Sequence, residues 1–107
     1  MTEAIALAPH ELALLTRVFR SHPEIEGVKL FGSRAKGTQT PHSDVDLALL
    51  GTVDSLQAEA ISAELDELPL PYRYDVKALA TITFRELREH IERVGISIYP
   101  LDANPDR

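Results

Sequence analysis

Two neighbouring stretches of this chain are the most informative about its fold: Gly32-Ser33-Arg34-Ala35-Lys36-Gly37 and Ser43-Asp44-Val45-Asp46-Leu47. The first stretch follows a short apolar run and predicts a strand that ends at a tight bend bounded by two glycines. The second stretch predicts the start of another strand. Because side chains at i and i+2 of an extended strand share a face, Asp44 and Asp46 are expected to project together.

The chemistry of these two stretches indicates phosphoryl or nucleotidyl transfer. Paired carboxylates are ligands of the kind that Mg²⁺ uses in proteins, usually together with substrate phosphates, and backbone N–H groups of a bend can bind the same phosphates. Asp46 lies within an apolar strand, where a carboxylate is costly to bury without a partner. A Walker A loop is excluded because Thr38-Gln39 follows Gly37 in place of Lys-Ser/Thr.

Periodicity outside these stretches predicts a small α/β domain. The expected helices cover residues 10–20, about 54–68 and 83–94, with one helical turn at 34–36, and the expected strands cover 28–31, 45–50, 72–79 and 96–99. Thr83 and Glu86 have the spacing of a capping box at the start of the last helix. The residues expected on the buried sides of the second and last helices are Leu56, Ile61, Leu65, Leu68, Leu87, Ile91 and Val94.

The order of these elements predicts a mixed β-sheet of three to four strands flanked by helices. A helix connects the second strand to the third, so these two strands are expected to be parallel neighbours. This arrangement places Asp75 on the strand beside the acid pair. A third carboxylate is what a site for two metal ions needs.

Composition limits the classes of function. At 107 residues the chain is expected to form one domain over 1–107, and its net charge of −6, without any run of Lys and Arg, argues against direct binding of nucleic acid. No apolar run is long enough to span a membrane, and the first residues lack the basic start of a signal peptide. The chain contains no cysteine. We therefore expect a cytoplasmic protein.

Gly32-Ser33, the run 43–47 and the later Asp75 together resemble the polymerase-beta-like nucleotidyltransferase superfamily. In length and layout the chain is similar to its smallest branch, the minimal nucleotidyltransferases (MNT), over about residues 10–100. Lys36 stands where the family often has arginine, which keeps the positive charge.

The resemblance implies the nucleotidyltransferase fold and Mg²⁺-dependent transfer of AMP from ATP to a hydroxyl group. The residues that match Asp44 and Asp46 bind two Mg²⁺ ions in that family. The residue that matches Asp75 ligates the catalytic metal and helps to activate the acceptor hydroxyl.

The same resemblance assigns the nucleotide triphosphate to Gly32, Ser33 and the adjoining backbone. Arg34 is a further candidate for a triphosphate contact, with an exposed residue of a short turn as the alternative reading. Lys77 shares a strand face with Asp75 and either steadies phosphate charge or pairs with that acid.

The partner implied by the resemblance is a small helical HEPN ribonuclease, the toxin of a toxin–antitoxin pair, which is silenced by AMP on a tyrosine. Two alternatives stay open: an antitoxin that blocks its partner sterically, and a small-molecule nucleotidyltransferase, which normally carries an additional helical domain. The sequence leaves open the nucleobase preference, the number of AMP units transferred and whether the chain forms a homo-oligomer or a hetero-oligomer.

Overall fold

The computed structural model describes residues 7–40 and 42–100, which form four strands and four α-helices around one mixed sheet. The elements follow the chain as α1 (Pro9–Arg20), β1 (Ile25–Phe31), α2 (Ser33–Lys36), β2 (Val45–Gly51), α3 (Ser55–Asp66), β3 (Tyr74–Ala78), the 3₁₀ turn η1 (Leu79–Thr81), α4 (Arg85–Val94) and β4 (Ile96–Tyr99). The predicted α/β fold class is therefore confirmed.

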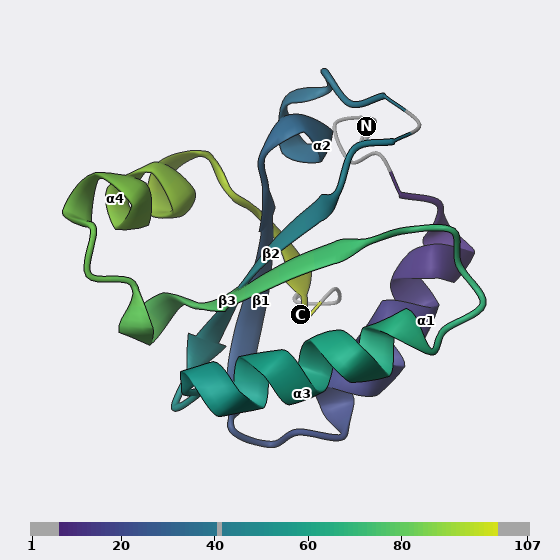
Figure 1. Ribbon diagram of the computed structural model, residues 1–107, viewed down its shortest axis with the longest axis horizontal. Coiled ribbons are helices and arrows are strands. Elements are labelled where there is room, and N and C mark those ends of the chain that lie inside the picture. Colours follow the sequence, from purple (N-terminus) through teal and green to yellow (C-terminus); the bar gives the residue numbers. More distant parts are fainter. Residues whose placement is uncertain (1–6, 41, 101–107) are drawn as a thin grey trace, which may run out of the picture.

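The sheet has the order β3-β2-β1-β4. Strand β1 is antiparallel to β2 and to β4, whereas β2 and β3 are parallel, as the intervening helix α3 predicts. Figure 1 shows α1 and α4 on opposite sides of these strands. Within the described part of the chain, no helix is both long and apolar enough to cross a membrane.

The main core lies on the sheet face that α1 and α3 cover. Leu15 and Phe19 of α1, with Ile61 and Leu65 of α3, are at most 1% exposed. The sheet residues in this cluster are Ile25, Val28, Leu30, Val45, Leu47, Leu49, Ala78 and Ile98. Helix α1 buries its apolar stripe here, as its helical spacing predicts.

The opposite face of the sheet carries a smaller apolar cluster and the predicted acids. Phe31 and Ala48 pack there with Leu79 and Ile91 under α4. Because alternate residues of a strand share a face, Asp46 lies on the same face as Ala48. Helix α4 and η1 thus cover one end of this face, and the acids lie toward the other end.

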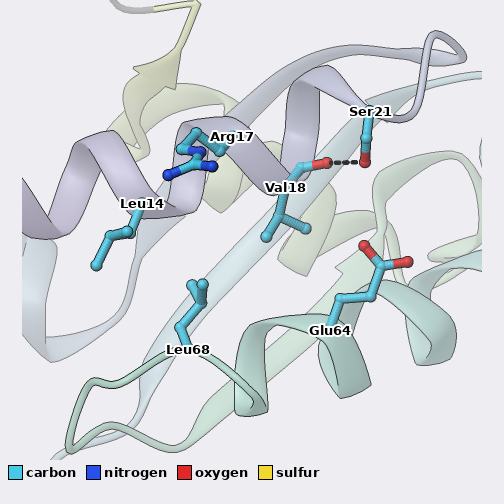
Figure 2. A pocket seen from close by; sticks show the side chains of 6 residues that line it. All are labelled: Leu14, Arg17, Val18, Ser21, Glu64 and Leu68. Carbon is cyan, nitrogen blue, oxygen red and sulfur yellow. Dashed lines mark hydrogen bonds between the residues drawn. The ribbon is translucent and has the colours of Figure 1, made fainter.

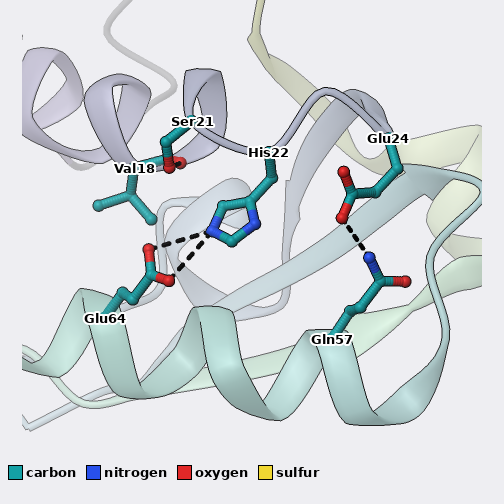
Figure 3. Close-up of polar contacts among 6 residues, drawn as sticks. All are labelled: Val18, Ser21, His22, Glu24, Gln57 and Glu64. Atoms are coloured by element: carbon teal, nitrogen blue, oxygen red, sulfur yellow. Dashed lines mark hydrogen bonds and ion pairs between the residues drawn. The ribbon is translucent and has the colours of Figure 1, made fainter.

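Polar contacts join α3 to the connection between α1 and β1 (Figure 3). His22 Nε2 lies 3.1 Å from both carboxylate oxygens of Glu64, and the Gln57 amide donates to the Glu24 carboxylate. Helix α3 begins with Asp54, whose side chain accepts a hydrogen bond from the Gln57 backbone N–H at 2.9 Å. This cap confirms the predicted start of α3.

Several local predictions were wrong. Leu56 and Val94 are 74% and 39% exposed, because each lies on the outer side of its helix rather than on the buried stripe. The N-cap of α4 is Phe84, without a side-chain cap, so the predicted capping box at Thr83 does not form. Strand β1 begins earlier than predicted because Ile25 pairs with Gly51, and β3 begins later, at Tyr74.

Candidate functional site

The predicted acids meet at the N-terminal ends of β2 and β3. Asp44 immediately precedes β2 and is exposed, whereas Asp46 is the second residue of β2 and is only partly exposed. In the parallel ladder, Asp46 is the register partner of Asp75. Paired residues of neighbouring strands point to the same face, so Asp46 and Asp75 lie side by side, as the order of the elements predicted.

Burial and the negative charges gathered at this site raise the pKa of Asp46. Burial raises the pKa of the Asp46 carboxyl above its ordinary value of 3.8, and the charges of Asp75 and Asp44 raise it further. The Lys77 ammonium acts in the opposite direction and lowers this pKa. A cation bound at Asp46 would therefore relieve an electrostatic penalty on this carboxylate.

Lys77 pairs with Asp75 on the same face of β3. Its Nζ lies 3.1 Å from Asp75 Oδ1 and 3.2 Å from Oδ2. This contact realises one of the two predicted roles for Lys77. The ammonium also supplies positive charge next to the acids.

The acids do not form a ready-made metal cluster. Within residues 7–40 and 42–100, no group of three His, Cys, Asp or Glu side chains is close enough to hold a metal ion as placed. Asp75 is turned to Lys77, and the like charges of Asp44 and Asp46 repel each other. The donor set nevertheless fits Mg²⁺, which binds oxygen ligands through one or two carboxylates plus phosphates.

Gly32 forms a close cradle for the Asp46 carboxylate. Its φ of 78° and ψ of −156° belong to a region that only glycine adopts readily. A Cβ atom at this position would overlap the Asp46 carboxylate, with Cγ only 3.0 Å away. The bend thus brings the backbone at Gly32, just before the start of α2, directly against the Asp46 carboxylate.

Arg34 is 5% exposed, so the reading as an exposed turn residue was wrong. The guanidinium carbon lies 4.7 Å from the centroid of the Tyr72 ring, and Nη2 donates to the Ser43 carbonyl at 3.1 Å. Tyr72 in turn donates to the Glu11 carboxylate at 2.9 Å. Sequence patterns identified neither Tyr72 nor Glu11, because these residues come from segments that only the folded chain brings together.

A groove of about 390 Å³ lies away from the acids, between α1 and α3 (Figure 2). Ser21 Oγ at one end donates to the Val18 carbonyl at 2.7 Å. Because α1 and α3 cover the other sheet face, this groove takes no part in the acid site. The residues that line it are Leu14, Arg17, Val18, Ser21, Glu64 and Leu68.

Comparison with known proteins identifies the family of the chain. The family described as "Polymerase beta, Nucleotidyltransferase" matches residues 14–104. A relative from Haemophilus influenzae, named probable protein adenylyltransferase MntA, is 33% identical over 90 residues, which cover 82% of this chain and 78% of the relative.

Solved structures share the fold. A toxin–antitoxin crystal structure with AMP-PNP has a TM-score of 0.70 at 23% identity, over 91% of this chain and 77% of the other. A complex of a tri-AMPylated Shewanella oneidensis HEPN toxin with its MNT antitoxin has a TM-score of 0.65 at 19% identity, over 84% and 70% of the two chains. The resemblance predicted from the motifs is thus confirmed: the chain belongs to the polymerase beta nucleotidyltransferase family and is a homologue of MntA.

Proposed function

We propose that this chain transfers AMP from ATP to a tyrosine hydroxyl of a partner protein, as the antitoxin of a toxin–antitoxin pair. The observation that carries the proposal is the placement of Asp46 and Asp75 at paired positions of β2 and β3, against the bend at Gly32. The name of the H. influenzae relative, a probable protein adenylyltransferase, supports the same reaction. The partner we propose is a HEPN-type toxin, like the one in the S. oneidensis complex.

The acids would hold the metal ions. Asp44 and Asp46 would bind two Mg²⁺ ions, and Asp75 would complete the ligand set of the ion nearer the acceptor hydroxyl. Bound Mg²⁺ supplies positive charge that lowers the cost of the developing negative charge on the transferring phosphoryl group. To bind this ion, Asp75 would have to release the Lys77 ammonium, with which it is paired in the structure. The released ammonium would then be available to a phosphate.

The bend would bind the triphosphate. The first N–H groups of a helix have no partner within the helix and favour an anion. Gly32 lets the bend lie against the Asp46 carboxylate, which a Cβ atom would overlap, so a phosphate bound at the bend would adjoin a metal ion held by Asp46. The Ser33 hydroxyl would add one more donor at the start of α2.

The partner would complete the cleft and provide the attacking oxygen. Helix α4 covers only part of the acid-bearing face, so a single domain over 1–107 would leave the rest open to an acceptor protein. A tyrosine held there would attack the α-phosphorus of ATP, and pyrophosphate would leave in line. We place this reaction in the cytoplasm, where ATP is available, and a chain without cysteine is compatible with that reducing compartment.

Mass spectrometry of a HEPN-type toxin co-expressed with this chain tests the proposal. We expect a tyrosine peptide heavier by one AMP or a short multiple of it, and no adduct with Asp44→Asn, Asp46→Asn or Ser33→Ala. Asp66→Asn, an exposed acid at the end of α3, is the matched control for the loss of one charge and should leave the adduct unchanged. A partner that is inhibited equally by the wild type and by Asp44→Asn, without an adduct, would identify a steric antitoxin instead.

A further inference from the structure

Arg34 is buried at the junction of three segments beside the acid site. Its guanidinium lies over the Tyr72 ring, and its Nη2 donates to the carbonyl of Ser43. That carbonyl belongs to the peptide bond between Ser43 and Asp44. Arg34 therefore holds the backbone that carries the first acid of the pair.

The backbone on the other side of Asp44 is fixed as well. The Val45 N–H donates to the Arg73 carbonyl at 2.8 Å. Asp44 thus lies between two anchored peptide groups, although it is exposed and outside the strand proper. Its neighbours in the loop are also bonded to one another. The Thr40 N–H donates to Ser43 Oγ at 2.8 Å, and the Ser43 N–H donates to the Thr40 carbonyl at 3.0 Å.

Tyr72 is held in place under the guanidinium by contacts of its own. Its hydroxyl donates to both carboxylate oxygens of Glu11, at 2.9 and 3.0 Å, and Glu11 accepts the Ala8 N–H at 2.8 Å. The Tyr72 ring also meets the Tyr74 ring edge-on, with centroids 6.4 Å apart. Glu11 at the start of α1 therefore fixes the Tyr72 ring, and this ring packs against the Arg34 guanidinium.

We propose that Arg34 is a positioning residue, which places the Asp44 carboxylate for metal binding by holding the Ser43–Asp44 peptide, with Tyr72 and Glu11 as its support. A side chain that is 5% exposed and turned to Tyr72 and Ser43 is poorly placed to bind a triphosphate directly. The planar guanidinium suits this role because it stacks on a ring and donates a directed hydrogen bond at the same time. The inference rests on the proposed function only in taking Asp44 as a metal ligand.

Amide hydrogen exchange of the protein without nucleotide or metal tests the structural step. In Arg34→Met, the Thr40 and Ser43 amides should exchange faster than in the wild type, because the loop loses its anchor. Tyr72→Leu should reproduce the change, whereas Tyr72→Phe keeps the ring and should restore most of the protection. Lys36→Met is the matched control, since Lys36 is an exposed cation on the same short helix.

Equilibrium binding of AMP-PNP, with and without Mg²⁺, tests the functional step. For Arg34→Met and Tyr72→Leu we expect metal-free binding of AMP-PNP within about twofold of the wild type, because neither side chain contacts the nucleotide. The gain in affinity on adding Mg²⁺ should fall roughly tenfold or more, as is typical when the support of a metal ligand is removed. Combining either variant with Asp44→Asn should cause little further loss, because both act through the same carboxylate.

Two results would overturn the inference. One is weaker metal-free binding of AMP-PNP by Arg34→Met with normal amide exchange in the loop, which would make Arg34 a direct ligand of the triphosphate. The other is normal exchange and normal Mg²⁺ dependence in Tyr72→Leu. A wild-type protein that binds no AMP-PNP would refute the proposed function, but the exchange experiment would still decide whether Arg34 holds the loop.

Discussion

Neutralising Asp46 should stabilise the metal-free protein. In Asp46→Asn the side chain keeps its shape but loses the charge that Asp75 and Asp44 oppose. The folded protein holds the Asp46 proton more tightly than the unfolded chain does, because its pKa is raised above 3.8. The free energy of unfolding therefore falls as pH rises from about 3.8 to the raised pKa, and it stays lower by a constant amount above that value.

The register of β2 and β3 sets the size of the effect. Neighbouring strands lie about 4.8 Å apart, and two unit charges about 5 Å apart repel by about 3 kcal/mol at an effective dielectric constant of about 20. Lys77 offsets much of this repulsion because its Nζ is 3.1 Å from Asp75, and water screens the exposed part of Asp46. A net gain of about 1 kcal/mol is therefore expected for Asp46→Asn, which corresponds to an increase in Tm of about 4 °C.

Thermal denaturation followed by circular dichroism between pH 3.5 and 8 measures this gain. Asp46→Asn should melt above the wild type at pH 7 and lose the advantage near pH 3.5. Glu59→Gln, an exposed acid on α3, is the control and should change Tm little at either pH. Mg²⁺ at ten times its Kd should add about 1.4 kcal/mol to the wild type and little to Asp46→Asn. An equal Tm for wild type and Asp46→Asn at pH 7, or an advantage that persists unchanged at pH 3.5, would refute the reasoning.

Three further variants test other parts of the structure. Gly32→Ala should cost about 2 kcal/mol or more in urea denaturation, because its φ of 78° is strained for alanine and its Cβ would meet Asp46; a loss within experimental error would contradict the cradle. Asp75→Asn should keep substantial ATP affinity while AMP transfer to the partner falls by orders of magnitude, and wild-type turnover would remove Asp75 from the site. Asp54→Ala should lose about 1 kcal/mol of unfolding free energy with its N-cap, whereas Ser55→Ala next to it should lose little.

Much of the fold could be predicted because its signals are local. Helix α1 and strand β2 each follow from a periodic apolar pattern bounded by Pro, Gly or polar residues, and the structure places them within about one residue of the prediction. The parallel pairing of β2 and β3 followed from one helical crossover. The errors occurred where burial depends on neighbours distant in sequence, as for Leu56, which the predicted stripe placed inside and the structure leaves exposed.

The candidate site also has a part that the sequence predicts and a part that it does not. The spacing of Asp44 and Asp46 is a local property of a strand, and the topology alone placed Asp75 beside them. The burial of Arg34 could not be predicted, because its partner Tyr72 lies 38 positions further along the chain, and Glu11 precedes it by 23 positions. No periodicity within one helix or strand encodes such a contact.

The α/β class, the order of the elements and the strand ends that carry the acids follow from local sequence patterns, because backbone geometry converts a spacing of two residues into a shared face. The pairing of polar side chains depends instead on how the folded segments pack. This packing turns Lys77 to Asp75, presses Gly32 against Asp46 and buries Arg34 between Tyr72 and Ser43. These contacts join segments far apart in the chain, and their geometry is set by the packing of the whole sheet and its helices.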